Sequence, residues 1–145
     1  MRLLYLSCDP GIPVLGRKGA SVHVREMVCA FESAGASVAL ASPRIRAEGE
    51  VLLGSAELIE IAPLLPKAHR TAESLEEAIE RQADEIAELA QRYEVDAVFE
   101  RYSLFTTGGV EAARLLAIPH ALEVNAPLRH EAVRFRSLPH ADLAA

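Results

Sequence analysis

The sequence predicts an α/β fold: a single domain with a Rossmann-like, doubly wound, mostly parallel sheet. Short apolar segments alternate with amphipathic helical segments along the chain, which is the pattern of a parallel sheet with helices on both faces. The length of 145 residues suits one compact domain. Half of the residues are hydrophobic, which is too many for a disordered chain. No apolar run approaches the roughly 20 residues of a membrane-spanning helix.

The first half of the chain contains three predicted strands and one helix. An apolar strand over 3–6 leads through a loop rich in glycine and proline to a helix over about 20–34. Gly35 stands at the expected C-terminal cap of this helix. A second strand covers 37–41. The third, over 57–61, alternates apolar and polar residues as a half-exposed edge strand does.

The second half alternates helices and strands. A long acidic helix comes first, and Ser74 with Glu77 is its candidate capping box. After it the sequence predicts, in order, a strand over 95–99, a helix over 108–117, a strand over 121–124 and a helix over 128–136. Right-handed crossovers between these strands favour the spatial order 3-2-1-4-5.

The net charge of −6 is unevenly distributed. Between Thr71 and Arg92, seven acidic residues outnumber two basic ones, so most of the excess lies in the acidic helix. We interpret this stretch as one solvated helix face. Because proteins that bind nucleic acids normally present a basic surface, we expect no nucleic-acid partner.

The N-terminus and the two cysteines indicate the compartment. The apolar run at the N-terminus is short and is broken by Asp9 and Pro10, so we interpret it as a buried strand rather than a signal peptide and expect a cytoplasmic protein. Cys8 and Cys29 form no close motif and are expected to be free thiols. The histidines are scattered, and no metal site is predicted.

Three loops at the carboxyl ends of predicted strands are candidates for ligand binding, because ligands of such sheets bind where the strand order reverses. The loop after the first strand contains Gly16 and Gly19 just before a helix N-terminus, which favours contact with phosphate or sugar. Ser21 is a candidate cap for this helix. The loop differs from a P-loop because Lys18 comes one position late and no Ser or Thr follows it.

Two alternative functions, an NADP-linked reductase and a receiver-type phosphoacceptor, have weak support. The dinucleotide fingerprint G-x-G-x-x-G is missing, and the second strand has no ribose-binding acid at its end. Arg44 and Arg46 could bind an additional phosphate, so an NADP-linked reductase remains an alternative. A receiver-type phosphoacceptor is disfavoured, since Asp9 has no second acid beside it.

Polar residues follow the strand at 95–99. Glu100, Arg101, Tyr102 and Ser103 come in succession, and an arginine beside a carboxylate is a directed donor for sugar or phosphate. An internal ion pair that braces the loop is the structural alternative.

Further candidates lie on the last strand and on the first helix. Glu123 interrupts an apolar strand and needs a partner, for which Arg101 is the candidate. Asn125 offers both a donor and an acceptor to sugar hydroxyls. His23 can bond a phosphate or hydroxyl, or it can be a packing residue, while Arg25 is expected on the solvated side. The basic residues of the last helix are expected on a solvated face or against further chain.

Three segments together resemble the N-terminal domain of family-four glycosyltransferases, which are retaining enzymes of the GT-B fold. They are GRKGASVHVRE at 16–26, ERYS at 100–103 and LEVNAPL at 122–128. The resemblance implies two Rossmann-like domains that face each other across a cleft. The N-terminal domain, 1–145, would hold the sugar acceptor, and a C-terminal domain, absent from this sequence, would hold the nucleotide sugar.

The resemblance also assigns roles to residues. Gly16 and Gly19 would lie against the donor diphosphate or the acceptor, His23 at the mouth of the cleft, and Asn125 near the acceptor and the transferred sugar. His23 and Asn125 are therefore the catalytic candidates. The substrate-binding candidates are Gly16, Lys18, Gly19, Glu100, Arg101, Tyr102 and Glu123.

The implied co-substrate is a nucleotide sugar, with no other cofactor. Because the paired glutamates and the diphosphate-binding charges of the second domain are missing, the chain alone is expected to transfer no sugar. A peripheral membrane contact and a homodimer are compatible with the sequence. The alternative is a non-catalytic glycan- or nucleotide-binding module, or the partner subunit of a split enzyme.

Overall fold

The protein contains a five-stranded sheet in which every strand pair is parallel. The structure is a computed structural model and describes residues 1–45, 53–64 and 71–144. The spatial order is β3-β2-β1-β4-β5, so the predicted fold class and strand order are confirmed. The strands are β1 Arg2–Ser7, β2 Ser37–Ser42, β3 Glu57–Glu60, β4 Ala97–Arg101 and β5 His120–Glu123.

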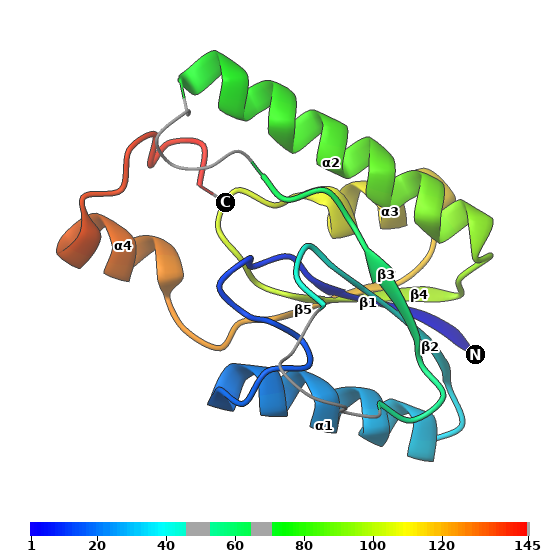
Figure 1. The fold of residues 1–145 in the computed structure, drawn as a ribbon. Helices are drawn as coiled ribbons and strands as arrows, with labels where there is room; N and C mark the ends of the chain where they lie inside the picture. Colours follow the sequence, from blue (N-terminus) through cyan, green and yellow to red (C-terminus); the bar gives the residue numbers. More distant parts are fainter. Residues whose placement is uncertain (46–52, 65–70, 145) are drawn as a thin grey trace.

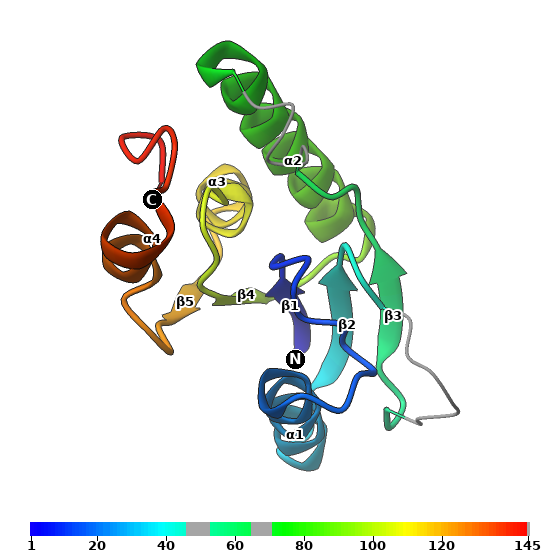
Figure 2. The ribbon, with the colours of Figure 1, turned by 60° about the vertical axis from the view of Figure 1, so that its left-hand side comes forward.

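Helices cover both faces of the sheet. Helix α1 (Gly19–Ser33) lies on one face, and α2 (Ala72–Arg92) and α3 (Gly108–Leu116) lie on the other (Figures 1 and 2). The last helix, α4 (Leu128–Arg136), lies beyond the carboxyl ends of the strands, and α1 begins at that same end (Figure 1). Gly35, with φ of +87°, follows the C-terminus of α1, as predicted.

Successive strand residues pack into different layers, since side chains alternate across a strand. Tyr5 belongs to the cluster beneath α1, with Val24 and Val28, while Leu4 and Leu6 belong to the cluster beneath α2 and α3. The Tyr5 and Phe99 rings meet edge to face at 5.1 Å between centroids. This alternation decides which polar residues meet at the ends of the strands.

The observed helix and strand ends correct three predictions. Strand β4 covers Ala97–Arg101 rather than 95–99, so Glu100 and Arg101 are strand residues. The capping box of α2 is Thr71 with Ser74, because Thr71 is the N-cap, and the prediction of Ser74 with Glu77 is wrong. The N-cap of α1 is Lys18, without a side-chain cap, and Ser21 is buried in the first turn.

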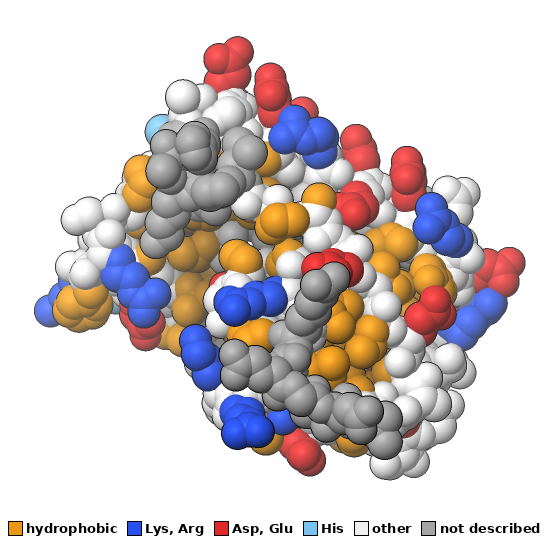
Figure 3. All heavy atoms as spheres, in the orientation of Figure 1, with side chains coloured by type: hydrophobic (Ala, Val, Ile, Leu, Met, Phe, Trp, Pro, Cys, Tyr) orange, Lys and Arg blue, Asp and Glu red, His pale blue; other side chains and the backbone are white. Residues whose placement is uncertain are grey.

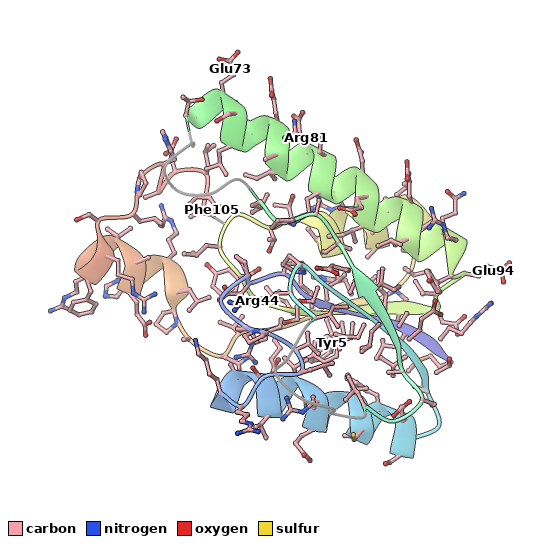
Figure 4. All side chains as sticks on the ribbon, in the orientation of Figure 1. Tyr5, Arg44, Glu73, Arg81, Glu94 and Phe105 are labelled. Atoms are coloured by element: carbon pink, nitrogen blue, oxygen red, sulfur yellow. The ribbon has the colours of Figure 1, made fainter. Side chains whose placement is uncertain are left out.

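The acidic residues of α2 lie mainly on its solvated face, as predicted. Figure 3 shows carboxylates along the outer edge over this helix, and in Figure 4 Glu73 and Arg81 point away from the sheet. Glu85 differs, because its carboxylate accepts from the Ala62 N–H.

Cys8 is buried, Cys29 is exposed, and both are free thiols. Across the described residues, no helix combines the length and the apolar character needed to cross a membrane.

The capping box yields the first prediction. Thr71 Oγ1 accepts from the Ser74 N–H at 3.1 Å, and Ser74 Oγ accepts from the Thr71 N–H at 2.9 Å. We expect Thr71→Ala to lower the free energy of unfolding by about 1 kcal/mol in urea denaturation, and Thr71→Ser to change it by less than about 0.5 kcal/mol. Equal losses in both variants would show that the hydroxyl does not cap the helix.

Candidate functional site

Two glycines shape the loop between β1 and α1, and they have different surroundings. A Cβ at Gly16 would lie 2.7 Å from Pro13 Cγ and 2.9 Å from the Pro13 carbonyl oxygen, so this position has no room for a side chain. A Cβ at Gly19 would meet nothing within 4 Å. The fold therefore requires glycine at 16, whereas the space over Gly19 is open to another molecule.

Arg25 fixes the conformation of this loop. Its guanidinium donates to the carbonyl oxygens of Val14, at 2.9 Å, and Gly16, at 2.6 Å. The expectation that Arg25 is a solvated residue is wrong, because the loop folds back along α1 and presents these carbonyl groups to it. The helix that begins at Gly19 thus holds its own preceding loop in place.

A charged cluster connects α1 to the ends of β4 and β5. The Glu123 carboxylate contacts His23 Nε2 through Oε1 and accepts from the Arg101 guanidinium through Oε2 at 3.3 Å. The exposed fractions of the side chains are 12% for Arg101, 18% for Glu123 and 41% for His23. The predicted Arg101–Glu123 contact is confirmed, and His23 belongs to the same cluster. The cluster is sheltered at Arg101 and opens to solvent at His23.

Three buried hydroxyl groups lie in the α1 layer near this cluster. Tyr5, Ser7 and Ser21 are at most 1% exposed, and their hydroxyls hydrogen-bond to nothing in the part of the chain that the structure describes. Burial raises the pKa of Tyr5, Glu123 adds to the rise and Arg101 opposes it, so the phenol keeps its proton. Sequence reasoning missed Tyr5 and Ser7. The available signal was their i, i+2 spacing on a strand that leads into the glycine loop.

Glu100 lies on the opposite face of the sheet from Arg101. It is 3% exposed, contacts His120 Nε2 at 3.0 Å and accepts from the Thr106 hydroxyl at 3.4 Å. Burial raises the pKa of Glu100, and the contacts with His120 and Thr106 oppose the rise. The structure therefore brings together His23, Arg101 and Glu123 but separates Glu100 from them.

The remaining candidates lie at the same end of the sheet. The Tyr102 N–H donates to the Glu123 carbonyl oxygen at 2.9 Å. Lys18 is exposed at the N-cap of α1, and Asn125 is exposed two residues after β5. Among the described residues, no cluster of three or more His, Cys, Asp or Glu side chains could hold a metal ion.

Of the two arginines that could bind the additional phosphate of NADP, Arg44 lies beside the glycine loop. The Arg44 guanidinium donates to the Pro10 carbonyl oxygen at 3.4 Å, so Arg44 packs against the glycine loop. Arg46 lies outside the described residues.

A hollow lies where the loops after β1 and β4 meet α4. It has a volume of about 180 Å³ and is lined by Cys8, Asp9, Phe105, Glu131 and other residues. Sequence reasoning considered Asp9 only as a phosphoacceptor, because nothing in the sequence shows that α4 closes this hollow.

Solved structures show where this fold occurs, although no family model and no curated protein matches the sequence. The glycosyltransferase SsfS6 from Streptomyces sp. SF2575, solved with thymidine diphosphate, aligns with a TM-score of 0.55 and 20% identity over 85% of this chain and 38% of its own. Phytolacca americana UGT2, complexed with UDP-2-fluoro-glucose and pterostilbene, aligns with a TM-score of 0.57 and 17% identity over 95% of this chain and 35% of its own.

A domain from a hydrogenase has the same fold. The C-terminal domain of PF1911 hydrogenase from Pyrococcus furiosus aligns with a TM-score of 0.53 and 16% identity over 85% of this chain and 90% of its own. Identities this low establish a common fold and nothing further. The chain spans little more than a third of SsfS6 and UGT2 but most of the hydrogenase domain.

The raised pKa of Glu100 yields a pH prediction. A carboxyl group whose pKa rises on folding stabilises the folded state when protonated, and this contribution is lost as the pH rises from the ordinary value of 4.5 through the raised pKa. We expect the free energy of unfolding of the wild type, relative to Glu100→Gln, to fall as the pH increases above 4.5.

Urea denaturation at a series of pH values measures this difference, and Glu111→Gln is the control. Glu111 is a half-exposed carboxylate on α3 that pairs with Arg114 at 3.1 Å, and its substitution controls for the loss of a carboxylate that is not buried. A constant difference for Glu100→Gln as well would contradict the assignment.

Proposed function

We propose that this chain is the acceptor-side domain of a retaining, family-four glycosyltransferase, which transfers a sugar from a nucleotide sugar to an acceptor. The observation that carries the proposal is that the open glycine loop and the cluster of His23, Arg101 and Glu123 share one end of the sheet, on the α1 face. Loops at the carboxyl ends of strands in such sheets are the usual place for a nucleotide or sugar ligand.

The N-terminal end of α1 suits a diphosphate. The first N–H groups of a helix have no partner within the helix and carry partial positive charge, so they bind anions. Lys18 adds a full charge at the N-cap, and α1 has no acidic residue in its first turn. The open space over Gly19 lets phosphate oxygens approach the backbone.

The charged cluster suits a sugar. Arg101 is held by Glu123 and can donate further hydrogen bonds, since a guanidinium has five N–H donors. Glu123 contacts Nε2 of His23, which leaves the other ring nitrogen for a substrate hydroxyl or phosphate. Asn125, just beyond β5, adds a donor and an acceptor for the transferred sugar.

Catalysis in this proposal requires a second domain or subunit. The leaving diphosphate must be stabilised by charges arranged around it, and one helix N-terminus with one lysine is a small part of such a site. SsfS6 and UGT2 were both solved with nucleotide ligands, and this chain aligns with 38% and 35% of their lengths. We therefore expect no sugar transfer by the chain alone, and turnover in a radiolabel assay would contradict this expectation.

We also propose that the protein acts in the cytoplasm. The supporting observation is that Cys8 and Cys29 are both free thiols, as is usual in a reducing compartment.

A non-catalytic glycan- or nucleotide-binding module, or the partner subunit of a split enzyme, is the second candidate. The hydrogenase domain supports this second candidate, because that domain is about as long as this chain and belongs to a hydrogenase rather than to a glycosyltransferase. A nucleotide-binding module would use the same phosphate site at α1 as the enzyme. Sugar transfer after addition of a nucleotide-sugar-binding partner would distinguish the enzyme from the binding module.

The two glycines provide the test of phosphate binding. In a titration of the ¹⁵N-labelled chain with inorganic pyrophosphate, we expect the amide signals of 16–21 to shift. We expect Gly19→Ala to weaken binding about tenfold, because the added methyl group occupies the space that the phosphate needs, with an unfolding free energy within about 0.5 kcal/mol of the wild type.

Gly16→Ala is the contrasting variant. Its methyl group meets Pro13, so we expect a loss of about 1–3 kcal/mol in stability. The proposed phosphate site would be wrong if pyrophosphate left 16–21 unaffected, or if Gly19→Ala bound it as tightly as the wild type.

A further inference from the structure

The hollow between β1, β4 and α4 lies at the point where the strand order reverses. In the order β3-β2-β1-β4-β5, the chain runs outward from β1 in one direction and from β4 in the other, so the loops after these two strands diverge and leave a crevice. Cys8 and Asp9 follow β1, and Leu104 and Phe105 follow β4. The hollow is on the α2 and α3 side of the sheet, where Cys8 packs with Leu4 and Leu6.

The walls of this hollow are largely apolar. Leu104, Phe105, Leu128 and Leu138 contribute hydrocarbon surface. Cys8 is 3% exposed, and burial, followed by Glu100 and Glu85, raises the pKa of its thiol, which therefore stays neutral. A ligand in this hollow would exchange water for apolar side chains over most of its surface.

The polar groups of the hollow are mainly acceptors. Asp9 and Glu131 contribute carboxylates, which accept but do not donate when ionised. The Asp9 carboxylate is oriented, because its Oδ1 accepts from the Gly11 N–H at 2.7 Å. The Ser103 hydroxyl is already bonded to the Thr106 hydroxyl at 2.9 Å, and Arg136 contributes the one cation among the described lining residues. Two carboxylates against one guanidinium leave the hollow with a net negative charge, which favours a ligand that brings hydrogen-bond donors over an anionic one.

The loop that forms one wall is held in a strained conformation. Phe105 has a φ of +68°, in the left-handed region that non-glycine residues rarely adopt, and is only 3% exposed. Figure 4 labels Phe105 in the loop after β4, on the α2 side of the sheet. Such conformations persist where the surrounding packing holds them, and they concentrate at binding sites. The hollow is thus formed before a ligand arrives.

The volume limits the size of the ligand. The hollow measures about 180 Å³, and apolar cavities of about 150 Å³ bind benzene. Whole pockets for drug-sized ligands measure about 300–1,000 Å³. The space therefore suits one six-membered ring with a short substituent.

We propose that this hollow binds a single ring-sized apolar group that carries hydroxyl groups and no negative charge, and that this group belongs to the sugar acceptor. The role as acceptor rests on the proposed function, whereas the class of ligand rests on the hollow alone. The hollow and the cluster of His23, Arg101 and Glu123 lie on opposite faces of the sheet at its carboxyl edge, so the acceptor would extend from the ring in the hollow over this edge toward the cluster.

Two probes with the same ring and different charge test the ligand class. We expect 4-(2-hydroxyethyl)phenol, which is neutral, to shift the amide signals of Asp9, Ser103 and Leu138 in the ¹⁵N-labelled chain. We expect 4-hydroxyphenylacetate, which has the same phenol but a carboxylate, to bind at least about tenfold more weakly, because it faces Asp9 and Glu131. Equal affinities, or shifts elsewhere in the chain, would overturn the proposal.

Substitutions in and beside the hollow test whether the neutral probe binds there. Ala132 is 4% exposed and lines the hollow, so Ala132→Leu should fill it and abolish binding of the neutral probe. Val133→Leu, at the next position of α4 and 51% exposed, should bind as the wild type does. The double variant Asp9→Asn, Glu131→Gln keeps the acceptor for Gly11 and should bring the two probes to within about threefold of each other.

The probe experiment separates this inference from the proposed function. If the neutral probe binds in the hollow but pyrophosphate leaves 16–21 unaffected, the ligand class stands, whereas the phosphate site on which the proposed function relies fails. If pyrophosphate binds but the neutral probe does not, the acceptor inference fails alone. If Ala132→Leu does not fold, the double variant still decides the outcome, because its substitutions conserve side-chain size.

Discussion

The carboxylate of Glu123 joins parts of the chain that are far apart in sequence. His23, which contacts one carboxylate oxygen, lies 100 positions earlier, and Arg101, which donates to the other, lies 22 positions earlier. Because Arg101 and Glu123 are only 12% and 18% exposed, their contact is sheltered from solvent, and loss of Glu123 would remove the carboxylate that compensates the mostly buried charge of Arg101. Together, the His23–Glu123 and Arg101–Glu123 contacts connect the start of α1 to the ends of β4 and β5, and the proposed phosphate and sugar sites depend on that connection.

Because side chains alternate along a strand, the polar groups at this end of the sheet are distributed over its two faces. Arg101 and Glu123 face α1 with the buried Tyr5, whereas Glu100, one position before Arg101, faces α3 with His120. The α1 face holds the charged cluster and the glycine loop. The α2 and α3 face holds the apolar hollow with Asp9 and Glu131 at its wall. An enzyme that joins a phosphorylated donor to an apolar, hydroxylated acceptor needs both kinds of surface along one edge.

Hydrophobic periodicity predicts the fold well because it depends on local sequence, and strand order follows from the handedness of crossovers. The Arg101–Glu123 contact was also predictable, since a carboxylate in an apolar strand needs a partner. The face of the sheet on which Glu100 lies could not be predicted, because it depends on where β4 ends. Strand ends are the least reliable part of a prediction from sequence. The hydrogen bonds of Arg25 and the existence of the hollow could not be predicted, because they depend on contacts that form only in the tertiary fold. The loop carbonyl groups lie beside Arg25, and α4 closes the hollow, only once the chain is folded.

A double-mutant cycle between His23→Ala and Arg101→Met tests most directly whether Glu123 unites this end of the sheet. Each residue contacts Glu123 through a different carboxylate oxygen, so any energetic coupling between them should run through that residue. We predict from urea denaturation a coupling of at least about 0.5 kcal/mol, which disappears in the Glu123→Gln background. Additive effects in the wild-type background, or coupling that persists without the Glu123 carboxylate, would contradict the account.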